Sequence, residues 1–122
     1  MRVLTTSLFF VALTASAFGQ QKQVPVYFIA EYDVLLDAAS LKKFAEAATP
    51  IAKAYGGQVV ARRTKIVPGL GEAPRGVTII MFENVEKAQA YFESAEYKAI
   101  IPLRDAAAKY RSYIVEAGDL LQ

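Results

Sequence analysis

Three side chains of this chain have the clearest capacity for chemistry on a small molecule: Tyr27, Glu31 and Arg62. Tyr27 can donate a hydrogen bond to a ligand, and Glu31 can act as a general base if burial raises its pKa. Arg62 can bind a carboxylate or an enolate, because a guanidinium presents its donors in a fixed planar fork. We therefore expect acid–base or anion-stabilising chemistry, if there is chemistry at all.

Each of these three residues also has a structural interpretation. Tyr27 can simply pack in a core or an interface, because a buried tyrosine needs only one partner for its hydroxyl group. Glu31 can lie at a solvated strand end. Arg62 can be an edge-strand charge that prevents aggregation. The sequence leaves these alternatives open.

Several classes of site are excluded because the 122 residues include no His and no Cys. A Ser-His-Asp triad, a Cys nucleophile, a zinc site of the usual ligand types and a His-ligated haem cannot form within this chain. Glu31 and Asp33 have strand spacing, which is only a weak signal for a carboxylate metal site. We expect neither a metal nor a cofactor.

A second group of candidates lies in residues 91–104, where Tyr97 and Arg104 are seven positions apart. They would share one face of a straight helix, but Pro102 interrupts the hydrogen-bond ladder between them. In a functional interpretation both line the mouth of a pocket. In a structural one Arg104 bridges to Glu96 or to loop carbonyls, Tyr97 packs on the first helix, and the segment lies mainly away from the cavity.

The first half of the chain predicts a strand and a helix. Residues 24–32 alternate with apolar side chains on both faces, and Tyr27, Ile29 and Glu31 share one of them. A helix follows Asp37, which can cap it, and its apolar positions keep the spacing of three and four residues. Gly56 and Gly57 then supply a left-handed stop.

The second half predicts a hairpin, a helical layer and a last strand. The expected elements are strands at 58–66 and 76–83 around a turn at 68–71, a helix capped by Asn84, a short turn capped by Ser94, a further helical piece from Pro102 through Ala108, and a strand at 110–116. The order βαββαβ predicts an α+β, ferredoxin-like fold: a four-stranded antiparallel sheet with its helices on one face.

This topology leaves one sheet face without helices, although Ile29, Phe82 and Ile114 cannot all face the helical layer. An apolar face of this size predicts an interface or a ligand groove. Two copies packed face to face would make a homodimeric α+β barrel around a cavity. The ligand-binding candidates for this cavity, on the face without helices and at its rim, are Tyr27, Ile29, Arg62, Phe82, Tyr97 and Arg104.

The N-terminal residues predict a secretory signal peptide at 1–19, with cleavage after Ala17 or Gly19, followed by a single domain at 20–122. The apolar run is too short to span a bilayer, which needs about 20 apolar residues. An ordered first strand or helix is the alternative. Loss of Arg2 leaves 13 basic against 12 acidic residues, so a nucleic-acid partner is not expected. We expect a periplasmic or secreted protein with no membrane association after cleavage.

Three segments of the chain together resemble the domain-of-unknown-function family 1330: residues 27–34, 55–62 and 91–104. The resemblance covers the whole mature chain. It implies the ferredoxin-like fold and membership of the dimeric α+β-barrel superfamily. Other branches of that superfamily include haem-degrading monooxygenases, cofactor-independent quinone-forming monooxygenases and muconolactone isomerases. The family has no established activity of its own, so the resemblance implies an architecture rather than a reaction.

The chain departs from the family pattern at two places. The arginine that matches Arg62 is usually followed by two glycines, where this chain has Arg63 and Thr64. The hairpin usually carries a glutamate and a tryptophan that have no clear match between Pro68 and Glu72. If the hairpin closes the pocket, these departures imply a different ligand preference.

Three functional hypotheses follow. The first is a homodimer that binds a small, largely apolar organic ligand with an anionic group held by Arg62. The second is a cofactor-independent oxygenase or isomerase that uses Tyr27, Glu31 or Arg62; the lack of His removes the haem-degrading branch in its usual form. The third is a structural or interaction module with no open site.

Overall fold

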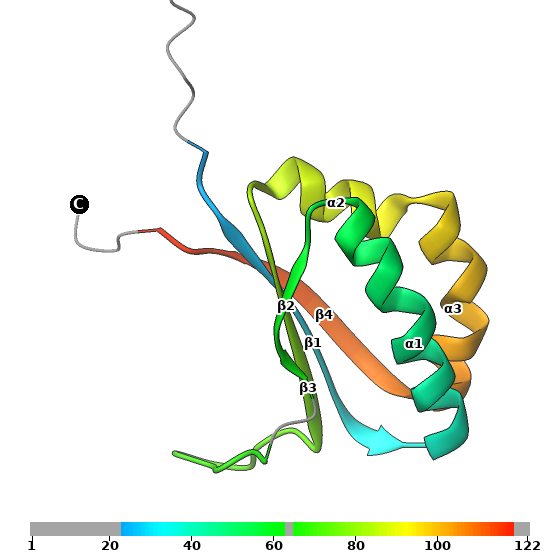
Figure 1. The fold of residues 1–122 in the computed structure, drawn as a ribbon. Helices are drawn as coiled ribbons and strands as arrows, with labels where there is room; N and C mark the ends of the chain where they lie inside the picture. The colour runs from blue at the N-terminus through cyan, green and yellow to red at the C-terminus, as the bar shows by residue number, and fades with distance from the viewer. Residues whose placement is uncertain (1–22, 63–64, 119–122) are drawn as a thin grey trace, which may run out of the picture.

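The computed structural model of the protein describes residues 23–62 and 65–118 (Figure 1). The predicted signal peptide at 1–19 lies outside these residues and stays a prediction. Within the described ranges no helix is long and apolar enough to cross a membrane. The elements are β1 (Val26–Leu35), α1 (Ala38–Ala54), β2 (Gln58–Arg62), β3 (Gly76–Phe82), α2 (Val85–Glu93), α3 (Ala95–Ala107) and β4 (Ala108–Glu116).

The four strands form one antiparallel sheet in the order β2-β3-β1-β4, and all three helices cover the same face of it (Figure 1). This is the predicted α+β architecture. Because side chains alternate along a strand, Phe28 and its even-numbered neighbours on β1 face the helices. Tyr27 and Ile29 lie on the opposite side, which we call the open face.

Helix ends were predicted well from local chemistry. The Asp37 side chain accepts hydrogen bonds from two backbone N–H groups at the start of α1. Asn84 caps α2 through the N–H of Lys87 at 2.9 Å. Ser94 caps α3 in the same way, and Gly56 adopts φ 81° after α1, which a side chain would disfavour. These four residues confirm the expected start and stop signals.

The prediction around Pro102 was wrong, because α3 runs without a break from Ala95 to Ala107. Proline removes one hydrogen bond of the ladder without preventing the helix from continuing. Buried residues on both sides of it, Tyr97 and Ala107, fix the helix to the rest of the core. Tyr97 and Arg104 are therefore two turns apart on one continuous element and share a face. Among the strands, β2 ends at Arg62 rather than at residue 66.

The core lies between the helices and the sheet, and one glycine in it makes room for an aromatic ring. A Cβ atom added at Gly76 would lie only 2.2 Å from Cζ of Tyr32, so the ring occupies the space above the glycine. Tyr32 is 6% exposed and contacts Tyr110 edge to face, with ring centroids 5.2 Å apart. A glycine inside a strand is costly on its own, and here it allows the close approach of this ring.

We expect the substitution Gly76→Ala to destabilise the protein by about 1–3 kcal/mol, because the new methyl group would overpack the space that Tyr32 fills. For a domain of this size each kcal/mol lowers the melting temperature by roughly 4–8 °C. Thermal unfolding followed by circular dichroism measures the effect. The matched control is Gly69→Ala, since nothing lies within 4 Å of the added atom there. Equal melting temperatures for the two variants would show that Tyr32 does not pack on Gly76.

Candidate ligand pocket

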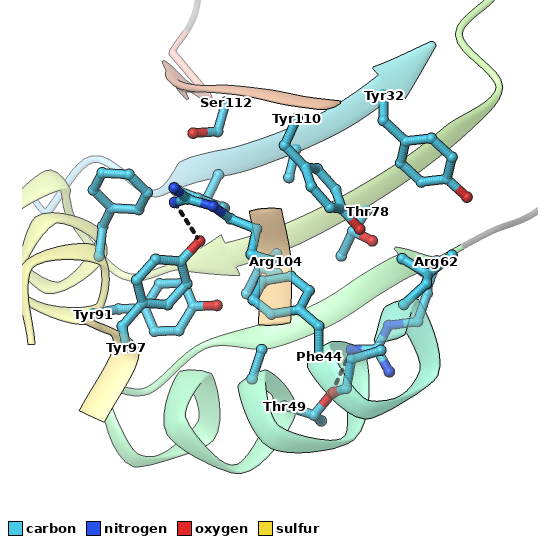
Figure 2. A pocket seen from close by; sticks show the side chains of 17 residues that line it. Tyr32, Phe44, Thr49, Arg62, Thr78, Tyr91, Tyr97, Arg104, Tyr110 and Ser112 are labelled. Atoms are coloured by element: carbon cyan, nitrogen blue, oxygen red, sulfur yellow. Dashed lines mark hydrogen bonds between the residues drawn. The ribbon is translucent and has the colours of Figure 1, made fainter. Parts of the chain in front are cut away.

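A cavity of about 270 Å³ lies between the helical layer and the sheet (Figure 2). Its floor is one row of side chains that crosses all four strands at the same register. Ala30 of β1 pairs with Thr78 of β3 and with Ser112 of β4, and Thr78 pairs with Arg62 of β2. Three of these four side chains are small. The side chains along this row therefore rise only a short distance above the sheet.

Larger side chains occupy the two neighbouring rows of the same face. Phe28 pairs with Ile80 on one side of the floor, and Tyr32 pairs with Tyr110 on the other side. The part of α1 above the floor is also built from small residues, Ala45, Ala48 and Thr49. Where small side chains of the sheet face small side chains of α1, a space remains between the two layers. The larger side chains in the two neighbouring rows do not fill it.

Aromatic rings make up most of the wall. Phe44 of α1 contacts both Tyr97 and Tyr110, with ring centroids 6.2 Å and 5.7 Å apart. Tyr97 also contacts Tyr91 and Phe92, in each case with centroids 5.1 Å apart. Edge-to-face and tilted contacts of this kind hold rings in fixed positions. The wall is thus a continuous, rigid aromatic surface that suits a planar ligand.

Arg62 reaches this pocket because of an irregularity in β2. Gln58 pairs with Met81 on the open face, so in a regular strand Arg62 would point to the open face as well. The register shifts between Val59 and Ala61, which inserts one extra residue and reverses the alternation. Arg62 therefore faces the helices and lines the pocket.

A hydroxyl group of α1 holds the Arg62 side chain. Arg62 Nη2 donates to Thr49 Oγ1 at 2.5 Å, and the Thr49 hydroxyl donates to the backbone oxygen of Ala45 at 2.8 Å (Figure 2). This chain of two bonds positions the guanidinium without neutralising it. Its remaining N–H groups have no hydrogen-bond partner among the described residues and can donate to a ligand.

Arg104 enters the pocket from α3 and stands beside Tyr97 (Figure 2). Its Nη1 donates to the Tyr97 hydroxyl at 3.4 Å, and its Cζ lies 5.8 Å from the centre of the Tyr97 ring. Its Nε forms an ion pair with the exposed Asp105 at 3.1 Å. Burial lowers the pKa of Arg104, but the contacts with Tyr97 and Asp105 outweigh it and raise the pKa overall. Arg104 is a fixed cation.

Tyr91 of α2 is only 2% exposed, yet its hydroxyl group points into the pocket (Figure 2). No hydrogen bond to this hydroxyl is present among the described residues. Burial, and then the neighbouring Tyr97, raise its pKa, although the charge of Arg62 acts in the opposite direction. Burial likewise raises the pKa of Tyr97. Both tyrosines are therefore neutral hydrogen-bond donors near pH 7.

Not all residues predicted from the sequence lie at this pocket. Tyr27 and Ile29 do point to the open face, as expected, and so lie outside it. Glu31 is also on the open face, where it forms an ion pair with Arg111 and accepts a hydrogen bond from Tyr113 at 3.3 Å. These contacts favour a structural role for Glu31 over that of a base.

Phe82 and Arg62 were expected on the open face, and both predictions were wrong; Arg62 faces the helices because of the bulge in β2. Phe82 does not face the open side: it is 1% exposed and packs against Tyr91 in the core, with ring centroids 5.5 Å apart. Its place follows from its pairing with Val26, which faces the helices. For Tyr97 and Arg104 the sequence left two directions open, toward a pocket mouth or away from the cavity; both line the pocket, which lies under the helices rather than on the open face.

Four residues that line the pocket were not predicted from the sequence: Tyr91, Thr49, Thr78 and Ser112. The position of Tyr91 on α2 beside Ala88 indicates only a core residue, which agrees with its burial. Thr78 and Ser112 do have a signal in the sequence. If the four strands are aligned, these two small residues fall at the same register as Ala30. That alignment needs the register of β2, which the bulge changes.

The charge of the pocket determines what it can hold. Two arginines and no Asp or Glu occur among its described lining residues. In the described ranges no group of three or more His, Cys, Asp or Glu side chains is arranged to hold a metal ion. The site presents hydrogen-bond donors and positive charge to an apolar, aromatic interior. This combination suits an organic anion.

The model of a domain of unknown function, DUF1330, matches residues 25–118. The chain belongs to this family. The match confirms the resemblance inferred from three segments of the sequence. No curated protein matches this DUF1330 chain.

Solved structures similar to this DUF1330 chain share its fold at low identity. One is a protein of unknown function from Rhodopseudomonas palustris, with 14% identity, a TM-score of 0.61 and coverage of 80% of this chain and 85% of that chain. Another is SnoaB, a cofactor-independent oxygenase from Streptomyces nogalater, with 11% identity, a TM-score of 0.58 and coverage of 80% and 97%. A third is a dimeric protein of unknown function from Bacteroides fragilis with a ferredoxin-like fold, with 15% identity, a TM-score of 0.52 and coverage of 75% and 95%.

We expect Tyr91→Phe to leave the protein as stable as the wild type at pH 7, or slightly more stable, because the removed hydroxyl has no described protein partner. Because burial raises the pKa of Tyr91, the unfolded chain loses this phenol proton before the folded protein does, so stability is unaffected below the ordinary pKa of 10.0 and falls as pH rises above it. The variant should therefore lose less stability than the wild type between about pH 10 and 11. Denaturant unfolding at several pH values measures both effects. A clear loss of stability at pH 7 would mean that the hydroxyl has a structural partner.

Proposed function

We propose that this DUF1330 protein binds a small, largely apolar organic anion in the pocket between α1, α3 and the sheet. The observation that carries the proposal is that Arg62 and Arg104 open into one aromatic pocket whose described lining contains no carboxylate. Arg62 has only the neutral hydroxyl of Thr49 as its hydrogen-bond partner among the described residues. A partly desolvated cation is costly without a counter-charge, and a ligand carboxylate would supply one.

The dimensions of the pocket support a ligand with a single ring. Its volume of about 270 Å³ is near the lower end of the range for small-molecule sites, about 300–1,000 Å³. At about 30 Å³ per water molecule it corresponds to roughly nine waters. A benzoate-sized molecule would fill most of it, with its ring against Phe44 and Tyr97.

Catalysis by a cofactor-independent oxygenase or isomerase is the second candidate. The fold likeness to the oxygenase SnoaB supports it, as do two arginines that would stabilise an enolate. The described lining offers no evident general base, because it has no carboxylate and the pKa values of Tyr91 and Tyr97 are raised. Such an enzyme would need a substrate that ionises readily. Oxygen uptake on addition of hydroquinone would support this candidate, and its absence would favour binding alone.

We also propose that the protein is a homodimer joined through its open face. That face carries Tyr27 and Ile29 of β1. Beside them lie Tyr113 and Val115 of β4, and each of these two β4 residues is 43% exposed. A contiguous apolar surface of this kind is typical of an interface. Structural neighbours from Bacteroides fragilis and Thermobifida fusca are described as dimeric, which supports the same arrangement here.

We expect Arg62→Gln to weaken benzoate binding by about tenfold or more, because the variant loses a charge-assisted hydrogen bond in a low-dielectric site. Folding should change little, since the lost partner is one hydroxyl. An NMR titration of the folded protein with benzoate measures the affinity. Benzamide, the neutral analogue, should bind the wild type more weakly and should not respond to the substitution.

Two further variants locate the binding. Arg75→Gln removes an exposed arginine outside the pocket and should leave benzoate affinity unchanged. Ala30→Leu keeps both arginines but fills the floor, so it should abolish binding. If Ala30→Leu binds benzoate as well as the wild type does, the anion binds on the surface and the proposal fails.

We expect Ile29→Glu to convert the dimer to a monomer, because it places a charge in the middle of the apolar open face. Light scattering coupled to gel filtration measures the mass at micromolar concentration. The matched control is Val67→Glu, which adds the same charge at a loop position that is already 78% exposed. A wild-type protein that is monomeric at this concentration would rule out the dimer.

A further inference from the structure

The pocket contains two separate cationic groups rather than one. In Figure 2 the guanidinium of Arg62 lies beside Thr49, and that of Arg104 lies beside the Tyr97 hydroxyl. The two arginines come from different elements, β2 and α3, and each guanidinium has its own hydroxyl partner; Arg104 also pairs with the exposed Asp105, which does not line the pocket. A ligand that fills the pocket therefore meets a cation in two places.

Both places offer hydrogen-bond donors to a ligand. The Thr49 hydroxyl donates its hydrogen to Ala45 and accepts from Arg62, so it has little left for a ligand. The Tyr97 oxygen accepts from Arg104, which leaves the Tyr97 hydrogen to be donated outward. Arginine cannot accept a hydrogen bond at all. Each end is therefore complementary to an oxygen acceptor and not to an amine.

Tyr91 adds an independent observation. The residue is only 2% exposed, and its hydroxyl points into the pocket with no partner among the described residues. No fully buried side-chain oxygen among the described residues lacks a partner, so the Tyr91 oxygen is accessible from the cavity, where it can donate to a ligand acceptor or to water. Because Tyr91 is held neutral by burial, it would act as a third donor to the same ligand.

We infer that the ligand has an acceptor group at both ends of an aromatic ring, as in an aromatic dicarboxylate or oxo-acid. One carboxylate binds Arg62, and the second carboxylate or a carbonyl oxygen binds Arg104 and Tyr97. The aromatic walls hold the ring between them. This inference rests on the proposed function and specifies the class of molecule that the same pocket takes.

Isothermal titration calorimetry of the full folded protein at fixed ionic strength tests the inference with benzoate, isophthalate, terephthalate and 4-aminobenzoate. We expect the better of the two dicarboxylates to bind about tenfold more tightly than benzoate, because it gains a second charge-assisted contact. The aminobenzoate should bind no more tightly than benzoate, because its amine is a hydrogen-bond donor and would face the donor groups of Arg104 and Tyr97.

Substitutions at the second end separate a specific contact from general attraction between charges. Arg104→Gln should lower the affinity for the dicarboxylate far more than the affinity for benzoate, so that the advantage of the dicarboxylate is lost, and Arg104→Lys should restore part of it. Tyr97→Phe should reduce the advantage without abolishing it. Arg75→Gln, outside the pocket, should preserve the advantage in full.

Two results would overturn the inference and leave the proposed function standing. One is benzoate binding that depends on Arg62 together with dicarboxylates that bind no more tightly. The other is a dicarboxylate advantage that survives in Arg104→Gln, which would mean that net charge alone produces it. If none of the four compounds binds, both the inference and the proposed function fail.

Discussion

The structure depends on small side chains that face one another across its two layers. One row of the sheet carries Ala30, Thr78 and Ser112, and the α1 residues above it are Ala45 and Ala48. Protein interiors normally fill such a space, since every unfilled volume sacrifices dispersion contacts. Here the larger side chains in the two neighbouring rows, Phe28 with Ile80 and Tyr32 with Tyr110, keep the helices and the sheet apart. The pocket is thus a consequence of how the core is packed.

The same aromatic packing gives the pocket its fixed shape. Tyr97 contacts both Phe44 and Tyr91, and these two rings contact the sheet through Tyr110 and Phe82 respectively. None of the three rings can turn into the cavity without losing ring contacts elsewhere. The polar groups are fixed as well, Arg62 by Thr49 and Arg104 by Tyr97. A site that is preformed in this way binds with little loss of side-chain entropy, which favours affinity for a rigid, planar ligand.

The sequence predicts the layers of this fold better than it predicts the site. Alternation along β1 correctly separates Phe28 from Tyr27 and Ile29, and cap residues mark the helix starts, because both signals act within a few residues. The site depends on longer-range facts. A bulge in β2 turns Arg62 to the helical side, and a helix that continues through Pro102 aligns Tyr97 with Arg104. No local sequence signal marks the bulge, so regular alternation is expected along β2. Pro102 likewise favours a break in the helix, and nothing local indicates that α3 continues through it.

The bulge in β2 and the continuous helix α3 also give the two faces of the sheet different properties. The open face has the apolar surface and the Glu31–Arg111 ion pair, which suit assembly. The helical side holds the cavity and its positive charge, with no carboxylate in the described lining. A regular β2 would place Arg62 on the open face, where it would stand in the proposed dimer interface as a buried cation and destabilise it. The bulge therefore serves both faces: it removes a charge from the proposed dimer surface and supplies that charge to the proposed ligand pocket.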